Sequence, residues 1–188
     1  TGLEVNADLV AACTQIARET GQTGLEFLAH DAAQWERVPM DILVALHACD
    51  TATDEAIHIG IEGGAEIIIC APCCQHELAP QLATTGIALG GIMRFGLFKQ
   101  RQADLVTDAA RALLLQAVGY DVRVIEFVDS EHTAKNVLLA GVRDASVDRA
   151  AGLEQYRALK TFMGFRSQRL EELLLASHRL DGLEAPAA

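Results

Sequence analysis

The chain has 188 residues, of which 51% are hydrophobic, 22% charged and only 5% aromatic, a composition that fits one α/β domain with an aliphatic core. Its 15 basic and 26 acidic residues give a net charge of −11, which argues against a domain that coats nucleic acid by electrostatics alone. No apolar run is long enough to cross a bilayer, so we expect no membrane contact.

The first half of the chain alternates between predicted strands and helices. Residues 2–5 form a short apolar strand, and Asn6 can cap a helix over 7–19. Alternating apolar residues predict a strand over 25–29, and an apolar run predicts a buried strand over 41–46.

The second half continues this alternation. The expected elements are, in order, a helix over 53–62, a strand over 65–70, a looser glycine-containing stretch over 75–100, a helix over 101–118, strands over 120–128 and 137–142, and a helical tail over 150–177 interrupted near Gly164. On the 101–118 helix we expect a core-facing set of Leu105, Ala109, Ala112 and Leu113. Together these elements predict a mostly parallel sheet with helices on both faces, whose last two strands pair antiparallel because no helix separates them.

Two polar turns directly follow buried strands. The segment LHACDTATD (46–54) ends the strand over 41–46, and APCCQHEL (71–78) follows the strand over 65–70. In open α/β sheets, ligands bind in the crevice beyond the carboxyl ends of the strands. We therefore expect both turns, which are rich in His, Cys, Asp and Thr, to face one crevice.

Three motifs give the chain a resemblance to a known family. LHACDTATD (46–54) and PCCQHE (72–77) are specific, and HTAKN (132–136) is suggestive. On these motifs the chain resembles class I S-adenosylmethionine-dependent methyltransferases, of the branch that includes methyltransferase-like proteins and tRNA acceptor-stem ribose methyltransferases. The resemblance implies S-adenosyl-L-methionine as the cofactor and methyl transfer as the reaction, with RNA as the preferred substrate class.

The resemblance also implies a fold, an α/β Rossmann-like methyltransferase sheet that is mostly parallel with an antiparallel last strand, in the order 3-2-1-4-5-7-6. The strand over 2–5 matches the family's second strand, and no glycine-rich loop precedes it. We therefore expect a chain that lacks the first strand and is inactive by itself. The expected domains are a partial methyltransferase domain over 1–145, a helical extension over 146–182 packed on it, and a disordered tail over 183–188.

Four residues are predicted to bind the cofactor. The resemblance places Glu4 where it accepts hydrogen bonds from the ribose hydroxyls, and Asp31 against the adenine amino group. It places Leu46 and His47 in the same site. The alternatives are a solvated acid before a helix for Glu4 and a local turn for Asp31.

His47, Cys49 and Asp50 are the first group of predicted catalytic residues. The sulfonium is already an activated leaving group, so the enzyme mainly aligns the nucleophile, which supplies several of the roughly 7–11 kcal/mol available from proximity. Asp50 or His47 can also take a proton from a ribose hydroxyl. The alternative is that Asp50, Thr51 and Thr53 cap the next helix, which does not exclude a function.

Cys73, Cys74 and His76 are the second predicted catalytic group. They either line the substrate pocket, as the resemblance suggests, or bind zinc with His47 and Cys49, or pack as small buried residues. Structural zinc sites prefer separated cysteine pairs, and adjacent residues of an extended chain point in different directions. We therefore rank pocket lining first, packing second and zinc third, and expect no metal.

Basic residues gather late in the chain and offer a local phosphate-binding patch. The late set is Arg149, Arg157, Lys160, Arg166, Arg169 and Arg179, and Arg94, Lys99 and Arg101 extend it. The alternative is a solvated helix face, which is the more common outcome.

The five cysteines, Cys13, Cys49, Cys70, Cys73 and Cys74, are odd in number and two are adjacent. They make a poor disulfide framework and favour a reducing, cytoplasmic location. The sequence thus favours a cytoplasmic methyltransferase that acts on RNA. Two alternatives from other classes stay open: a Cys/His metal-binding or redox domain, and a non-catalytic scaffold that keeps the fold for partner binding.

Overall fold

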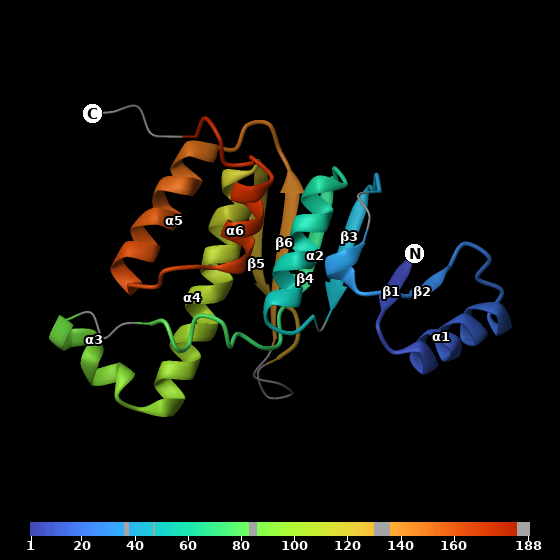
Figure 1. The fold of residues 1–188 in the computed structure, drawn as a ribbon, viewed down its shortest axis with the longest axis horizontal. Helices are drawn as coiled ribbons and strands as arrows, with labels where there is room; N and C mark the ends of the chain where they lie inside the picture. Colours follow the sequence, from blue (N-terminus) through green and yellow to red (C-terminus); the bar gives the residue numbers. More distant parts are fainter. Residues whose placement is uncertain (36–37, 47, 83–85, 130–135, 184–188) are drawn as a thin grey trace. The chain divides into compact units, whose positions relative to one another are not determined.

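A computed structural model describes residues 1–35, 38–46, 48–82, 86–129 and 136–183 of the chain (Figure 1). The chain divides into two compact units, Thr1–Val38 and Pro39–Ala188. Among the described residues, no helix combines the length and the apolar character that a membrane span requires.

The first unit has one helix between two short parallel strands. Its elements are strand β1 (Gly2–Glu4), helix α1 (Ala7–Glu19), strand β2 (Phe27–Ala29) and a 3₁₀ turn over Ala32–Gln34. Asn6 caps α1 as predicted, because its Oδ1 accepts hydrogen bonds from the backbone N–H groups of Asp8 and Leu9.

The second unit is built on a four-stranded sheet. Its strands are β3 (Ile42–Leu46), β4 (Ile67–Ala71), β5 (Tyr120–Glu126) and β6 (Val137–Arg143). They lie in the order β3-β4-β6-β5, with β3 parallel to β4 and β6 antiparallel to both of its neighbours. The predicted antiparallel pairing of the last two strands is therefore confirmed, and the order agrees with the 4-5-7-6 part of the order that the resemblance implies.

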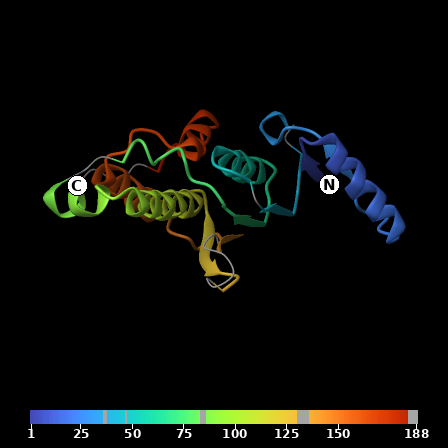
Figure 2. The ribbon, with the colours of Figure 1, turned by 90° about the horizontal axis from the view of Figure 1, so that it is seen from below.

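The helices described in the second unit cover one face of this sheet. They are α2 (Thr51–Glu62), α3 (Gly86–Met93), α4 (Gly96–Ala117), α5 (Arg149–Met163) and α6 (Arg169–Ala176). Helices α2 and α4 pack on the sheet, α6 on α2 and α5 on α4, and Figure 2 shows α2, α4 and α6 on the same side. On the other side, Ile42, Val44 and Leu46 of β3 are more than half exposed.

The prediction of helices on both faces is therefore wrong for the described part of this unit. The chain passes from β3 through α2 to β4 and then through α4 to β5, always in one direction across the sheet. Because such crossovers are right-handed, successive helices that advance in one direction lie on the same face.

Helix α4 differs from the prediction at its start and in its buried face. It begins at Gly96 and not near 101, and α3 occupies part of the stretch that we expected to be loose, because glycine lowers helix propensity without forbidding a helix. Leu105, predicted to face the core, is 65% exposed, whereas Val106 and Ala110 are buried. Of the other predicted residues, Leu113 packs against the core, and Ala109 and Ala112 are partly buried. The polar residues Thr107, Asp108 and Arg111 share the buried face of α4, so the apolar spacing alone gave only part of that face.

The C-terminal helices pack within the second unit. Gly164 has a left-handed backbone with φ of 72° and ends α5, so the predicted interruption of the helical tail is confirmed. The apolar core of this unit joins α2, β4, α4, α5 and α6, with Ile57, Ile68, Leu114 and Leu174 all fully buried.

Candidate functional site

The two polar turns meet where β3 and β4 end. Asp50 Oδ1 accepts hydrogen bonds from the backbone N–H groups of His76 at 2.9 Å and Glu77 at 3.0 Å, and the Asp50 N–H donates to the Cys74 carbonyl at 3.1 Å. The structure thus brings Cys49 and Asp50 together with Cys73, Cys74 and His76, as the sequence predicted. His47 lies outside the described residues.

Asp50 holds a strained backbone at this junction. Its φ is 52° and its ψ is −127°, a conformation that residues other than glycine rarely adopt and that costs of order 1–3 kcal/mol. Its side chain makes no capping bond to α2, so the capping alternative does not hold for Asp50. The hydroxyl of Thr53 makes no such bond to α2 either. It donates instead to the Ala48 carbonyl at 2.5 Å.

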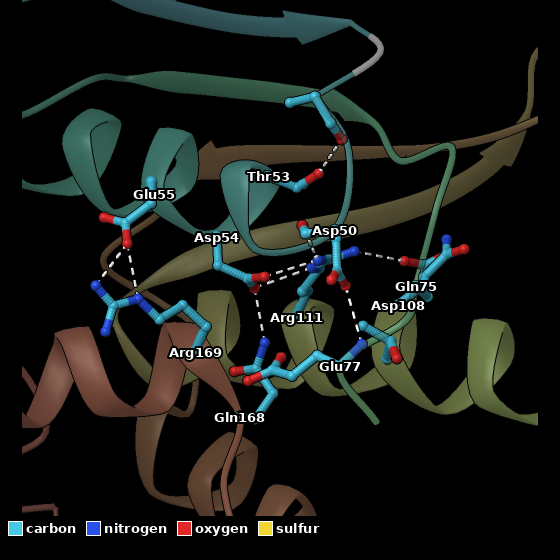
Figure 3. Close-up of polar contacts among 12 residues, drawn as sticks. Asp50, Thr53, Asp54, Glu55, Gln75, Glu77, Asp108, Arg111, Gln168 and Arg169 are labelled. Carbon is cyan, nitrogen blue, oxygen red and sulfur yellow. Dashed lines mark hydrogen bonds and ion pairs between the residues drawn. The ribbon is translucent and has the colours of Figure 1, made fainter. Parts of the chain in front are cut away.

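A buried arginine supports the Asp50 turn from below (Figure 3). Arg111 of α4 forms a bidentate ion pair with Asp54 of α2, with N–O distances of 3.0 and 2.7 Å. Its Nη2 also donates to the Asp50 carbonyl at 2.8 Å, and its Nη1 donates to Asp108 at 3.1 Å. The side chains of Arg111 and Asp54 are fully buried. Their ion pair holds the guanidinium between α2 and α4, and its bond to the Asp50 carbonyl fixes the strained turn to these two helices.

Two buried glutamines complete the network. Gln75 Nε2 donates to Asp108 Oδ2 at 3.0 Å, and Gln168, just before α6, donates to Asp54 Oδ1 at 2.6 Å. Burial raises the pKa of Asp108, although Arg111 and Gln75 oppose the rise. Burial alone would lower the pKa of Arg111, but the carboxylates of Asp54 and Asp108 outweigh it and raise that pKa. The guanidinium therefore stays charged in the core.

Glu77 is a feature of the site that the sequence reasoning missed. Burial raises its pKa from 4.5 to about 7, and the negative charge of Asp54 adds to the rise. Its Oε2 is buried without a hydrogen-bond partner among the described residues. The side chain lies near the buried network, since the charges of Asp54 and Arg111 both act on its pKa. The pattern PCCQHE contains Glu77, but only the packing around it reveals its environment.

The cysteines of the two turns converge. The Sγ atoms of Cys49 and Cys73 lie 3.1 Å apart, and the three Sγ atoms of Cys49, Cys73 and Cys74 all lie within 4.8 Å of one another. The expectation that the adjacent cysteines diverge is wrong, because β4 ends at Ala71 and strand alternation no longer applies beyond it. Burial and the neighbouring thiols of Cys49 and Cys74 raise the pKa of Cys73 to about 12.

The predicted cofactor acids Glu4 and Asp31 belong to the first unit. Glu4 ends β1, and its Oε1 accepts the N–H of Asn6 at 2.9 Å. Asp31 is exposed and follows β2, which pairs parallel with β1, so both acids lie beyond the same edge of that sheet. His30, next to Asp31, stacks edge-on against Trp35 with ring centroids 5.3 Å apart. Leu46 ends β3 in the second unit and is 58% exposed.

Most of the late basic residues bond within the protein. Lys160 pairs with Glu171, Arg169 with Glu55 and Arg179 with Glu62, while Arg149 donates to the Ala117 carbonyl. These contacts leave little of the late set to bind phosphate. Arg94 and Arg101 are exposed near the start of α4.

The third motif falls mostly outside the described residues, which omit 132–135. Its last residue, Asn136, is buried, and its Nδ2 donates to Glu126 Oε1 and to the Val128 carbonyl. Asn136 thus holds the ends of β5 and β6 together.

A family model described as "Methyltransferase domain" matches residues 1–81 of the chain. The matched residues contain the predicted cofactor acids Glu4 and Asp31 and both polar turns of the second unit. No curated protein matches the chain. The family match supports a methyltransferase, the class that the motifs implied.

Proposed function

We propose that this chain is part of an S-adenosylmethionine-dependent methyltransferase that acts on RNA. The observation that carries the proposal is the junction of the two polar turns through Asp50, inside the segment that matches the methyltransferase family. The parallel β1/β2 pair with acids beyond one edge, and the strand order of the second unit, add support.

The residues of the first unit fit the adenosine part of such a cofactor. Ribose hydroxyls and an adenine amino group are hydrogen-bond donors, and Glu4 and Asp31 offer carboxylate acceptors beyond the carboxyl ends of parallel strands. The bound cofactor supplies the activated methyl group. Glu4 and Asp31 bind and orient its adenosine, because alignment is the main contribution that this reaction needs.

Asp50 acts as a positioning residue in this proposal. Its Oδ1 already accepts two backbone hydrogen bonds, and its backbone is bonded to Arg111 and Cys74. It therefore fixes the positions of the two turns that carry Cys49, Cys73, Cys74 and His76. Removal of the nucleophile's proton falls to the exposed His76 or to His47, which lies outside the described residues.

Support for RNA comes from the exposed surface where α3 meets α4. Phe95 and Phe98 are 53% and 48% exposed and lie edge to face at 5.7 Å, and the Arg94 guanidinium lies 5.3 Å above the Phe95 ring. Arg101 is exposed one turn further along. Exposed aromatic rings interleaved with arginines can stack on unpaired bases and bind phosphates, even on an acidic protein.

Transfer of a radiolabelled methyl group tests the proposal. A protein that contains this chain is incubated with methyl-tritiated S-adenosylmethionine and total RNA, and the products are digested with nuclease or protease. We expect label that nuclease releases and protease does not. Label that only protease releases would make protein, and not RNA, the substrate class. If no methyl group is transferred and no cofactor is bound, the result favours the non-catalytic scaffold.

A double variant tests the RNA surface. Phe95→Ala with Phe98→Ala should raise the KM for RNA about tenfold or more, because each stacked base is worth about 1–3 kcal/mol, with little change in kcat. Phe162→Ala on α5, which removes a ring that is 62% exposed, is the matched control and should leave KM unchanged. An unaltered KM in the double variant would remove this surface from the proposal.

A further inference from the structure

Three thiols converge where β3 and β4 end. The Cys49 and Cys73 sulfurs lie 3.1 Å apart, and Cys74 brings a third sulfur within 4.8 Å of both. Thiolates bound to one Zn²⁺ at about 2.3 Å in a tetrahedron lie about 3.8 Å from one another. The sulfur positions therefore match three ligands of a single ion to within about 1 Å.

Core packing does not account for this cluster. Cys70 shows what a packing cysteine looks like in this chain, since it is fully buried within the apolar core of the second unit. Cys49, by contrast, is exposed, and Cys73 and Cys74 are only partly buried. None of these three belongs to the apolar core. Their sulfurs lie against one another at an accessible site, which an ion can enter.

The backbone on both sides of the cluster is already in place. Asp50, next to Cys49, bonds through its N–H to the Cys74 carbonyl and through Oδ1 to the N–H groups of His76 and Glu77. Arg111 holds the Asp50 carbonyl from the core. An ion would therefore bind a preorganised site, which lowers the ordering cost of binding.

We propose that Cys49, Cys73 and Cys74 form a three-thiolate site for a single thiophilic cation, Zn²⁺ or Cu⁺. Thiolates select these ions over hard cations. Cu⁺ is satisfied by three thiolates, whereas Zn²⁺ takes a fourth ligand such as water. The bound ion links the ends of β3 and β4. This proposal does not depend on methyl transfer, because the same ligands bind an ion whether or not the crevice is catalytic.

Metal titration of the full chain tests the site. The protein is reduced with a phosphine, stripped with a chelator, and titrated anaerobically with Zn²⁺ or Cu⁺ against a chromophoric competitor, with native mass spectrometry for stoichiometry. We expect one ion per chain. Cys49→Ser and Cys74→Ser should each weaken binding by at least about tenfold, and Cys13→Ser, on α1, should not. Elemental analysis of the protein as purified, before stripping, then shows which of the two ions it carries, because raw affinity for thiolates favours copper at almost any such site.

Alkylation gives a second readout that needs no variant. The bound ion should slow the reaction of Cys49, Cys73 and Cys74 with iodoacetamide and leave Cys13 unaffected. Because Cys49 is exposed, Cys49→Ser should keep the fold, which circular dichroism checks. No stoichiometric uptake of either ion, or equal affinity in Cys49→Ser, overturns the proposal. So does a Cys49–Cys73 disulfide in air combined with no metal uptake after reduction, since that result identifies a redox pair.

Discussion

Asp50 joins two turns through one carboxylate and holds a positive φ while it does so. Asp50→Ala removes the acceptor of two backbone N–H groups and keeps a side chain in the strained conformation, so we expect a loss of about 2–3 kcal/mol in the free energy of unfolding. Asp50→Asn retains an amide oxygen and should lose about 1 kcal/mol or less. Urea unfolding followed by circular dichroism measures both. Equal losses would show that the oxygen acceptor is not what stabilises the turn.

Glu77 should make stability fall as the pH rises. Burial raises its folded pKa to about 7 from an ordinary 4.5, so between these values the folded chain keeps a proton that the unfolded chain releases, and stability is lost as pH rises through this window. Glu77→Gln removes that loss. Allowing for its half-exposed position, we expect the variant to gain roughly 1–2 kcal/mol relative to wild type between about pH 5 and about pH 8.

Unfolding measured at several pH values checks the Glu77 prediction. Glu154→Gln, which changes an exposed glutamate of α5, is the control, and its free energy of unfolding should change with pH as that of wild type does. If the free energy of unfolding of Glu77→Gln also follows wild type at every pH, the carboxyl group of Glu77 titrates normally in the folded chain.

At the scale of the elements, Arg111 connects α2, α4 and the Asp50 turn. Arg111→Met leaves two buried carboxylates without their cation, and we expect a loss of about 3–5 kcal/mol in the free energy of unfolding. Arg111→Lys should recover little, because an ammonium cannot reproduce the bidentate geometry. Arg101→Met, at an exposed position of the same helix, should change stability by about 0.5 kcal/mol or less. A small loss in Arg111→Met would mean that water or repacking compensates the carboxylates.

The sequence predicted the elements better than their buried faces. Alternation of apolar runs and helices, and the missing helix between the last two strands, were enough to predict the sheet and its antiparallel pair. Arg111 could not be recognised, because its partner Asp54 lies 57 residues away and a lone arginine in a helix usually faces solvent. Because polar side chains occupy part of the buried face of α4, the apolar pattern identified only part of that face, and Leu105 was predicted to be buried although it is exposed.

At the scale of the whole molecule, the sequence placed the two turns together because the carboxyl ends of neighbouring parallel strands meet at one edge. The contact of Asp50 with the second turn agrees with this. The convergence of Cys49, Cys73 and Cys74 could not be predicted, because the chain beyond Ala71 has no strand periodicity to fix where adjacent side chains point. Their metal preference and the roles of the cofactor acids stay predictions.

The first unit should be less stable than the second, and hydrogen exchange should measure the difference. The first unit spans 38 residues, and Ala17 is the only buried apolar residue described in it. Units of this size rarely bury enough apolar surface to be stable by themselves. Hydrogen exchange of the native chain should therefore be faster in α1 than in α2 or α4, whose buried side chains belong to the core of the second unit.

In a protein that contains this chain, added S-adenosylmethionine should then slow exchange in the first unit. A ligand that binds only the folded state stabilises it by mass action, so a tenfold excess over Kd should raise protection of the β1 and α1 amides by a factor of about ten. Glu4→Gln weakens the charge-assisted bond to the ribose, worth about 1.5–3 kcal/mol, and should abolish most of this gain. Asp8→Asn, an exposed acid in the first turn of α1, is the control and should retain it. If the cofactor leaves exchange of the first unit unchanged at every concentration while methyl transfer proceeds, Glu4 is a surface acid and the adenosine binds elsewhere in the protein.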